Sequence, residues 1–383
     1  MNPYVTSPTG NAKPAVFLYL FLSFFLSGAA LPLYAQLGAT PKFAGKVQKA
    51  ILQLTAYGRQ GETLRTGTAF YVGADGEALA DYALLRGSYK ATVTDVQGRQ
   101  ADVDCILGAD DTYSMVRFRV NTTGNPVLQV AATAVPLGST VYALPFTRQK
   151  PKVCPSATVV ESAPVGERYS YYTLSADLGA EAVGTPVFNE AGELVGILQA
   201  AVGGKSYVMD IRYREELKIS AFMPTATTLA LNGINISKGL PDTKEEALVY
   251  TYFKSQTAGN AEYGELMDRF IQAFPDNAEG YYRRATLRAD MRRYDEAEAD
   301  LQQYESLSDN KEAATVYAST LRAQILGVKG DVNGALALYD RLCAEGHQSP
   351  GILYAISTLR ETRGDSLSAI IEPLNTAIAS FST

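Results

Sequence analysis

The feature that most constrains the fold is a change of pattern between residues 223 and 246. Before it, short apolar runs of strand length are separated by Gly, Asp, Asn and Pro, which favours an all-β domain. After it, Ala, Leu, Glu, Arg and Tyr recur at helical spacing. The strand-like runs are 50–58, 66–73, 89–96, 101–108, 113–120 and 140–146. We therefore predict a β domain over 36–222, a turn-rich linker over 223–241 and a helical domain over 242–383.

Residues 1–35 have the organisation of a signal peptide. Lys13 precedes an apolar run over 15–33, and Ala35 is the small residue that a signal peptidase prefers. We predict cleavage after Ala35 and export to the periplasm or the cell exterior. The alternative is an uncleaved membrane anchor, since about 20 apolar residues span a bilayer, but Pro32 weakens it. The first cysteine is Cys105, so a lipid anchor on a cysteine near the signal is not expected.

Charge and cysteine content limit the classes of partner and cofactor. The net charge is -6: residues 1–241 carry +2 and residues 242–383 carry -8, so no basic footprint predicts a nucleic-acid partner. Cys105, Cys154 and Cys343 are too few and too far apart for a disulfide scaffold or a metal site. Pairing of Cys105 with Cys154 stays open beside the alternative of buried thiols. No cofactor or metal is predicted.

The helical part contains internal repeats. Within 278–307, aromatic Tyr281 and Tyr294 alternate with small Ala285 and Ala297. Similar patterns follow over 316–342 and 353–374, and a weaker one precedes them over 245–274; the spacing from Ala335 to Ala369 is 34 residues. This region resembles about four tetratricopeptide (TPR) repeats, although Arg284 and Arg288 occupy positions that this family usually makes apolar or aromatic. An unrelated helical bundle is the alternative.

The β domain resembles the trypsin-like serine proteases of the HtrA type over residues 45–218. Residues 66–120 match the order of its first barrel, the GTPVFN stretch at 184–189 matches its nucleophile turn, and 206–217 match its closing strand. The resemblance implies a trypsin-like double β-barrel, and we expect this fold followed by the TPR-like helical domain.

The resemblance carries the family's catalytic positions onto residues that lack the required chemistry. The histidine position falls on Ala83, the aspartate position on Ser114 and the nucleophile position on Val183. Removing the nucleophile or its base typically costs about 10⁶ in turnover. The chain's one histidine, His347, lies in the helical part, so no shift of alignment supplies a histidine to the β domain. We therefore predict a domain without peptidase activity.

Other candidate chemistry is weaker. Lys205 and Ser206 could form a Ser-Lys pair, but consecutive strand residues point to opposite faces, which favours a hairpin turn. Asp110 and Asp111 could form a paired-carboxylate or metal site, but adjacent acids in a turn are usually solvated.

Binding is the function that remains. Val183 either fills the former reaction cleft or lines an open groove in which a peptide pairs with a strand edge. Stacked helix pairs also present a concave face, and Arg284, Arg288 and Arg292 are spaced four apart along one predicted helix face, as possible partner-binding residues. We predict a secreted pseudoprotease with a repeat scaffold that binds a protein or peptide. The alternatives are an active peptidase of unconventional mechanism and a purely structural envelope component.

Overall fold

Six strands in the first part of the chain close into a barrel. The computed structural model describes residues 36–151, 153–221 and 226–380. The barrel strands are β2 (Ile51–Tyr57), β3 (Thr63–Tyr71), β4 (Glu77–Asp81), β5 (Lys90–Thr94), β6 (Gln100–Asp110) and β7 (Met115–Val120). They follow the order β2-β3-β4-β7-β6-β5, and all neighbours are antiparallel.

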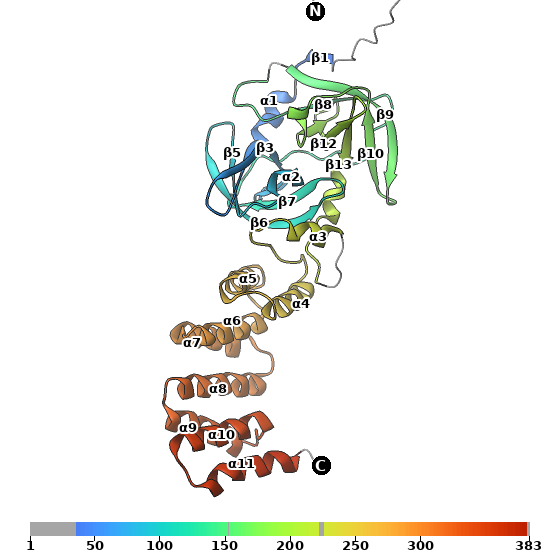
Figure 1. Cartoon of the computed structure of the whole chain (residues 1–383). Coiled ribbons are helices and arrows are strands. Elements are labelled where there is room, and N and C mark those ends of the chain that lie inside the picture. The colour runs from blue at the N-terminus through green and yellow to red at the C-terminus, as the bar shows by residue number, and fades with distance from the viewer. Residues whose placement is uncertain (1–35, 152, 222–225, 381–383) are drawn as a thin grey trace, which may run out of the picture. The chain divides into compact units, whose positions relative to one another are not determined.

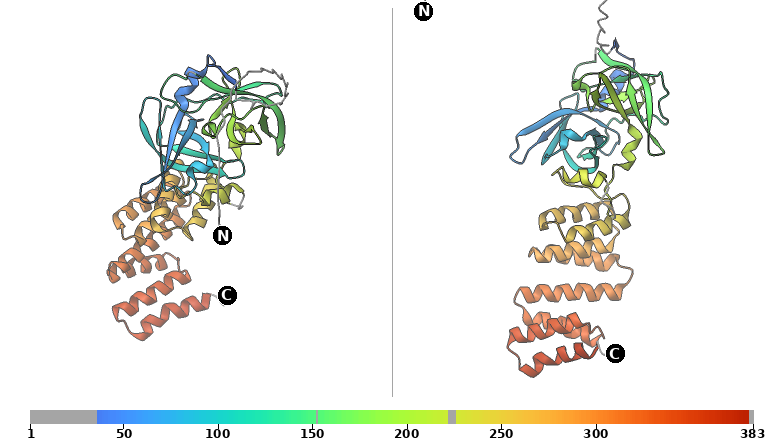
Figure 2. Two further views of the ribbon diagram at one scale, coloured as in Figure 1. Left: turned by 45° about the horizontal axis from the view of Figure 1, so that its top comes forward. Right: turned by 45° about the vertical axis from the view of Figure 1, so that its right-hand side comes forward.

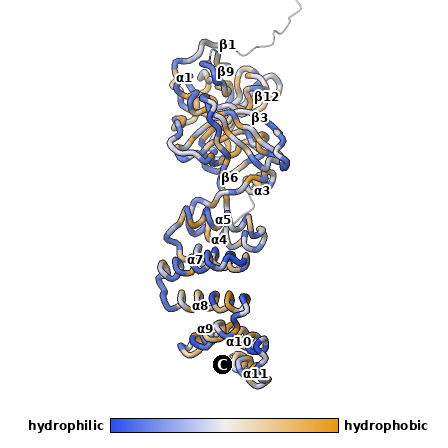
Figure 3. Tube along the Cα trace, turned by 90° about the vertical axis from the view of Figure 1, so that its left-hand side faces the viewer, coloured by the Kyte–Doolittle hydropathy of each residue, from blue (hydrophilic) through white to orange (hydrophobic). Residues whose placement is uncertain are grey.

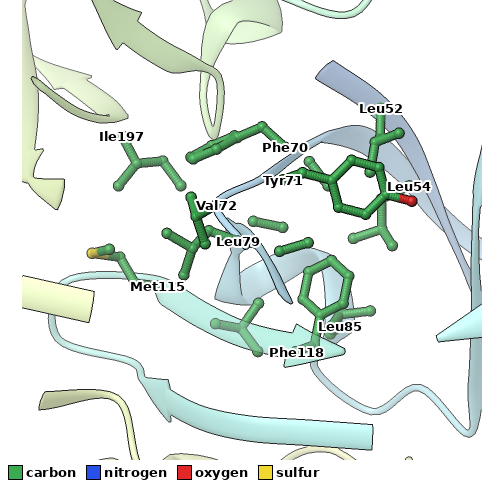
Figure 4. Packing of buried hydrophobic residues seen from close by; sticks show 14 of the residues in the cluster. Leu52, Leu54, Phe70, Tyr71, Val72, Leu79, Leu85, Met115, Phe118 and Ile197 are labelled. Carbon is green, nitrogen blue, oxygen red and sulfur yellow. The ribbon is translucent and has the colours of Figure 1, made fainter. Parts of the chain in front are cut away.

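The first barrel forms because alternate residues of its strands are apolar and turn inward. Leu52 and Leu54 of β2 are fully buried, as are Phe70 of β3 and Phe118 of β7. Figure 4 shows these side chains packed together, with Ile197 from the second barrel beside them. The core of the first barrel is therefore continuous with the surface on which the second barrel packs.

The second barrel is built by the strands that follow. They are β8 (Thr140–Ala143), β9 (Val153–Val165), β10 (Tyr169–Leu174), β11 (Pro186–Phe188), β12 (Leu194–Val202) and β13 (Lys205–Asp210). The sheet order is β9-β10-β13-β12-β11-β8, and a β8–β9 pairing closes it; β1 (Gln36–Ala39) pairs with the other edge of β9. The prediction of a double β-barrel is confirmed.

The segment predicted as a linker differs from that prediction. It contains α3 (Ala226–Asn232), whose Ala230 and Leu231 are buried in the first barrel's core together with Ile234 and Ile236. Beyond α3 the chain adds to β6: Ile106 N–H donates to the Ser237 carbonyl at 2.9 Å. This segment therefore completes the first barrel and does not act as a free tether.

The described residues beyond 241 form eight helices in four consecutive pairs (Figure 1). They are α4 (Lys244–Ser255), α5 (Asn260–Ala273), α6 (Ala278–Asp290), α7 (Tyr294–Leu307), α8 (Lys311–Val328), α9 (Val332–Ala344), α10 (Pro350–Arg363) and α11 (Leu367–Ser380). Figure 2 shows from two further directions that successive pairs lie next to one another. The predicted helical domain is confirmed.

The helices begin where the sequence offers capping side chains. Thr243, Asn277, Asn310, Asp331 and Ser349 each accept a hydrogen bond from the first turn of the helix that follows. Such caps satisfy amide groups that have no partner within the helix. The starts of five of the eight helices are thus set by local sequence.

Hydrophobic positions recur within both barrels and on each helix (Figure 3). Among the residues that the structure describes, no helix combines the length and the apolar character required to cross a bilayer. The predicted signal peptide, residues 1–35, lies outside the described residues.

Candidate functional site

Two of the three sequence positions compared with the catalytic triad, Ala83 and Ser114, bond one side chain, Asp81, and the residue after the third position lies against it. Asp81 ends β4, and its Oδ1 accepts a hydrogen bond from the Ala83 amide at 2.7 Å and from Ser114 Oγ at 3.0 Å. On the other side lies the turn at Val183: a Cβ placed on Gly184 would lie 2.9 Å from the Asp81 Cβ. Ala83 is exposed, whereas Ser114 and Val183 are partly exposed. The site is therefore accessible to solvent.

The turn at Gly184 requires glycine. Gly184 has φ +78°, in the left-handed region, and its missing side chain makes room for Asp81. Its amide donates to the Leu198 carbonyl at 2.8 Å, which fixes the turn on β12. Val183 precedes it as the C-cap of a short 3₁₀ helix, η2 (Ala180–Ala182). The local backbone therefore holds Gly184 against Asp81 and fixes the position of Val183 next to it in the chain.

Ser114 is one of two non-glycine residues with positive φ in the part of the chain that the structure describes. Its φ is +45°, a conformation that costs energy for a residue with a Cβ. Two hydrogen bonds compensate: Oγ donates to Asp81, and the Ser114 carbonyl accepts from the Tyr82 amide at 3.1 Å. These bonds orient the serine hydroxyl toward Asp81.

Asp81 is the residue at this site that sequence reasoning missed. Its side chain is buried, and this burial raises the pKa of its carboxyl, while the hydrogen bonds from Ala83 and Ser114 oppose the shift. The available signal was its place before a predicted turn of helix, since Asp caps the short helix α2 (Tyr82–Leu85). A cap indicates only the start of a helix, and it does not show that Ser114, before β7, and Gly184, before β11, lie next to Asp81.

Replacing Asp81 with asparagine should raise the melting temperature at pH 7. The folded-state pKa lies above the usual value of 3.8, so stability from this group is present at low pH and is lost as pH rises through the folded pKa. Asparagine keeps an Oδ1 acceptor without the buried charge. We expect the advantage of Asp81→Asn to shrink toward pH 4 in thermal melts. Asp111→Asn, on the exposed neighbouring turn, is the control and should have no effect.

The two barrels meet at Asp110 and a group of tyrosines. Asp110 is buried and accepts hydrogen bonds from the Thr112 and Tyr113 amides and, at 2.6 Å, from Tyr213 Oη. Asp111 is exposed. Asp110 therefore holds the turn that leads to Ser114, and it does not form a carboxylate pair with its neighbour.

The tyrosine at the end of that turn continues the contact between the barrels. Tyr113 packs edge-on against Tyr213 with ring centroids 5.0 Å apart, and it also contacts Tyr171 of β10. Burial and the bonded Asp110 raise the pKa of Tyr213. These tyrosines connect the turn before β7 with β10 and with the residues that follow β13.

The segment after the second barrel forms hydrogen bonds with α2 and with the residues directly after it. Tyr82 Oη donates to the Ala230 carbonyl of α3 at 3.0 Å, the Gly87 amide donates to the Gly233 carbonyl, and the Asn235 amide donates to the Ser88 carbonyl. The short helix α2, which carries Ala83, is therefore fixed by residues about 150 positions later. No local pattern in the sequence could have indicated this contact.

The arginines predicted as partner-binding residues are differently arranged. Arg284 and Arg288 of α6 both bond the buried Asp300 of α7, at 2.7 Å and 2.6 Å, and Arg284 also bonds Asp268. Arg292 lies beyond the end of α6, with φ +61°. The prediction of one helix face bearing all three was wrong, because the helix ends two residues before Arg292.

The remaining candidates lie apart from Asp81. Lys205 is exposed while Ser206 is buried and accepts a hydrogen bond from the Leu178 amide, so these neighbours face opposite sides of β13. Cys105 and Cys154 are free thiols, one in each barrel, and burial raises the pKa of Cys105 to about 11. His347 lies after α9, 3.8 Å from a Glu312 carboxylate oxygen.

Comparison with known proteins agrees with the geometry of the β domain. Residues 67–197 match the family model described as a trypsin-like peptidase domain. The anti-sigma-I factor RsgI9 of Acetivibrio thermocellus is 26% identical over 151 residues, which are 39% of this chain and 21% of that protein. The chain thus spans about a fifth of this curated relative.

Among solved structures, the Rv3671c protease of M. tuberculosis in its active form aligns with a TM-score of 0.40 and 18% identity, over 49% of this chain and 90% of the protease. The β domain is a trypsin-like double barrel.

Proposed function

We propose that this protein is an exported, non-catalytic binding protein in which a trypsin-like domain without a catalytic triad is joined to TPR-like repeats. One observation carries the proposal: Ala83 and Ser114, on which the family resemblance places the histidine and the aspartate, both bond a single carboxyl group, Asp81, and Gly184, which follows Val183, lies against it. Acyl transfer by this family needs a nucleophile, a base and a group that orients the base. Alanine and valine side chains can supply none of these roles.

The residual pair of Ser114 and Asp81 is a poor substitute for the triad. An effective general base has a pKa near the working pH. A carboxylate is usually a much weaker base than this and removes a proton from a serine hydroxyl poorly. Oδ1 of Asp81 is also occupied by the Ala83 amide. The pair is better explained as a helix cap and a stabilised turn.

Support for a binding role comes from tyrosines on the first helices of the pairs. Tyr252 of α4 and Tyr317 of α8 are each 54% exposed, and Tyr354 of α10 is 66% exposed. Tyr282 of α6 lies between the first two, with its ring 5.8 Å from that of Tyr317. Tyrosine supplies apolar contact area and a polar group at low entropic cost, which is why it is enriched in interfaces.

The repeat scaffold would present these tyrosines on one face. The small residues Ala285, Ala297 and Ala335 are fully buried, which allows close helix packing of the kind that TPR repeats use. Stacked pairs of this type expose a concave surface made by their first helices. We infer that a protein or peptide partner binds there.

The proposal predicts that the purified protein reacts with no serine-directed probe. A fluorophosphonate probe and a broad peptide library should give no labelling and no turnover for the wild type, with an active trypsin-like protease as positive control. Labelling that disappears in Ser114→Ala, or in Ser206→Ala, would overturn it and support the alternative of a peptidase with an unconventional mechanism.

A second experiment separates a binding protein from a purely structural envelope component. Cross-linking in the native envelope should capture the same partner with the full chain and lose it in Tyr317→Ser/Tyr354→Ser. Leu229→Ser, at another exposed apolar residue, should retain it. Unchanged envelope cross-links in all variants would favour the structural alternative.

The predicted signal peptide has its own test. If it is cleaved after Ala35, the N-terminal sequence of the exported protein should begin at Gln36.

A further inference from the structure

The last helix of the described residues, α11, is already held on one face by α10. Ser357 Oγ donates to the Ile370 carbonyl at 2.7 Å. Pro373 has no amide hydrogen, so it leaves the Ala369 carbonyl without its helical partner, and Arg360 Nη1 donates to that carbonyl at 2.9 Å. The inner face of α11 is thus bonded and packed against the preceding helix.

An exposed apolar stripe runs along the outer face of α11, the face that does not contact α10. Leu367, Ile371, Leu374 and Ile378 follow one another at spacings of four, three and four residues. Leu367 is 71% exposed, Ile371 39% and Ile378 65%, and Leu374 is partly exposed. The exposed apolar residues therefore form one row along this helix.

We propose that the outer face of α11 is a self-association surface that pairs with α11 of a second copy of this chain. The spacing of its four residues is the heptad pattern by which two helices interlock their side chains. A twofold axis brings the same stripe of each copy onto the other, so the contact would be symmetric.

The charge of α11 also favours a second copy over a charged partner. Its only charged residue is Glu372, and Arg360 pairs with it at 3.2 Å. The residues beside the stripe on the solvent side, Ser368 and Asn375, are neutral and exposed. Two copies can therefore approach without repulsion between like charges, whereas the helix offers little to attract an acidic or basic surface.

The area that the stripe can bury sets the expected affinity of the dimer. One helix from each copy buries less area than the roughly 1,200 Å² of a standard stable interface. We therefore expect a reversible dimer with a dissociation constant on the order of tens of micromolar. The proposal is independent of what the tyrosine face or the Asp81 site binds.

Sedimentation equilibrium of the full chain from about 1 to 200 micromolar tests the proposal. The wild type should pass from monomer to dimer across this range. Ile371→Glu/Ile378→Glu should weaken the dimer at least about 100-fold, because each copy would bring two charges into an apolar contact. Leu367→Ser, at the most exposed of the four positions, should weaken it less and leave the thermal melt unchanged.

Thr376→Glu is the matched control, because it adds the same charge to an exposed position off the stripe. It should dimerise as the wild type does. A wild type that stays monomeric at 200 micromolar would overturn the proposal. So would a dimer that survives Ile371→Glu/Ile378→Glu, or one that is lost in Thr376→Glu.

Discussion

Gly108→Ala is expected to lower the free energy of unfolding by about 3 kcal/mol, at the upper end of overpacking effects. Gly108 lies in β6 at a register shift, and a Cβ there would be 2.1 Å from the Leu217 carbonyl carbon and 2.5 Å from the Lys218 nitrogen. Both are backbone atoms, so no side-chain rotation relieves the contact. The added methyl group would push the chain leaving the second barrel away from the first.

Gly45→Ala is the matched control for this change. Gly45 lies in the short helix α1 (Ala44–Val47), and a Cβ there would have no heavy atom within 4 Å. Chemical denaturation should show this variant within about 0.5 kcal/mol of the wild type. Equal stabilities for the two alanine variants would show that residues 217–218 do not pack on β6 as described.

Asp300→Ala should destabilise the helical domain by about 3 kcal/mol. The Asp300 side chain is 4% exposed and pairs with both Arg284 and Arg288, whose side chains are 16% and 15% exposed. Removing the carboxylate leaves two largely buried guanidinium groups short of their partner, which costs more than the pairing itself contributes. The loss should appear as an earlier helical transition in far-UV circular dichroism during urea unfolding.

Glu296→Ala provides the comparison, because it removes an acid from the same helix at a position that is about half exposed. Exposed ion pairs contribute about 0 to 1 kcal/mol, so this variant should stay close to the wild type. If both variants lost the same stability, Asp300 would not be a buried centre of the arginine pairs.

Most of the secondary structure was predictable from local sequence. The run 51–57 forms a strand because its apolar residues alternate and a turn with Gly58 and Gly61 follows it. The helices after Thr243, Asn277 and Asn310 begin there because these residues cap them. The segment after 225 was misjudged. Its turn-rich composition indicated a linker, yet α3 and Ile234 fill the first barrel's core. Composition indicates how readily a segment forms turns, but it does not indicate which surface of the protein the segment covers.

The candidate site was predictable only in part. Ala83, Ser114 and Val183 were identified through the family resemblance, and their approach to one another follows from closing the barrels. Asp81 was not identified, because nothing near it in the sequence shows that Ser114 would donate to it. Likewise, the spacing of Arg284 and Arg288 indicated a basic face, but Asp300, which is sixteen and twelve residues further along the chain, bonds both.

The sequence by itself determined that this chain has a β part and a helical part, and that its single histidine lies outside the β part. These conclusions depend on periodicity, turn residues and residue inventory, which are local or countable. Only the tertiary structure decided that Asp81 bonds both Ala83 and Ser114 and that Leu367, Ile371 and Ile378 of α11 are left exposed. Such properties depend on contacts between segments far apart in sequence, where burial changes the chemistry of a carboxyl group and packing leaves one helix face without a neighbour.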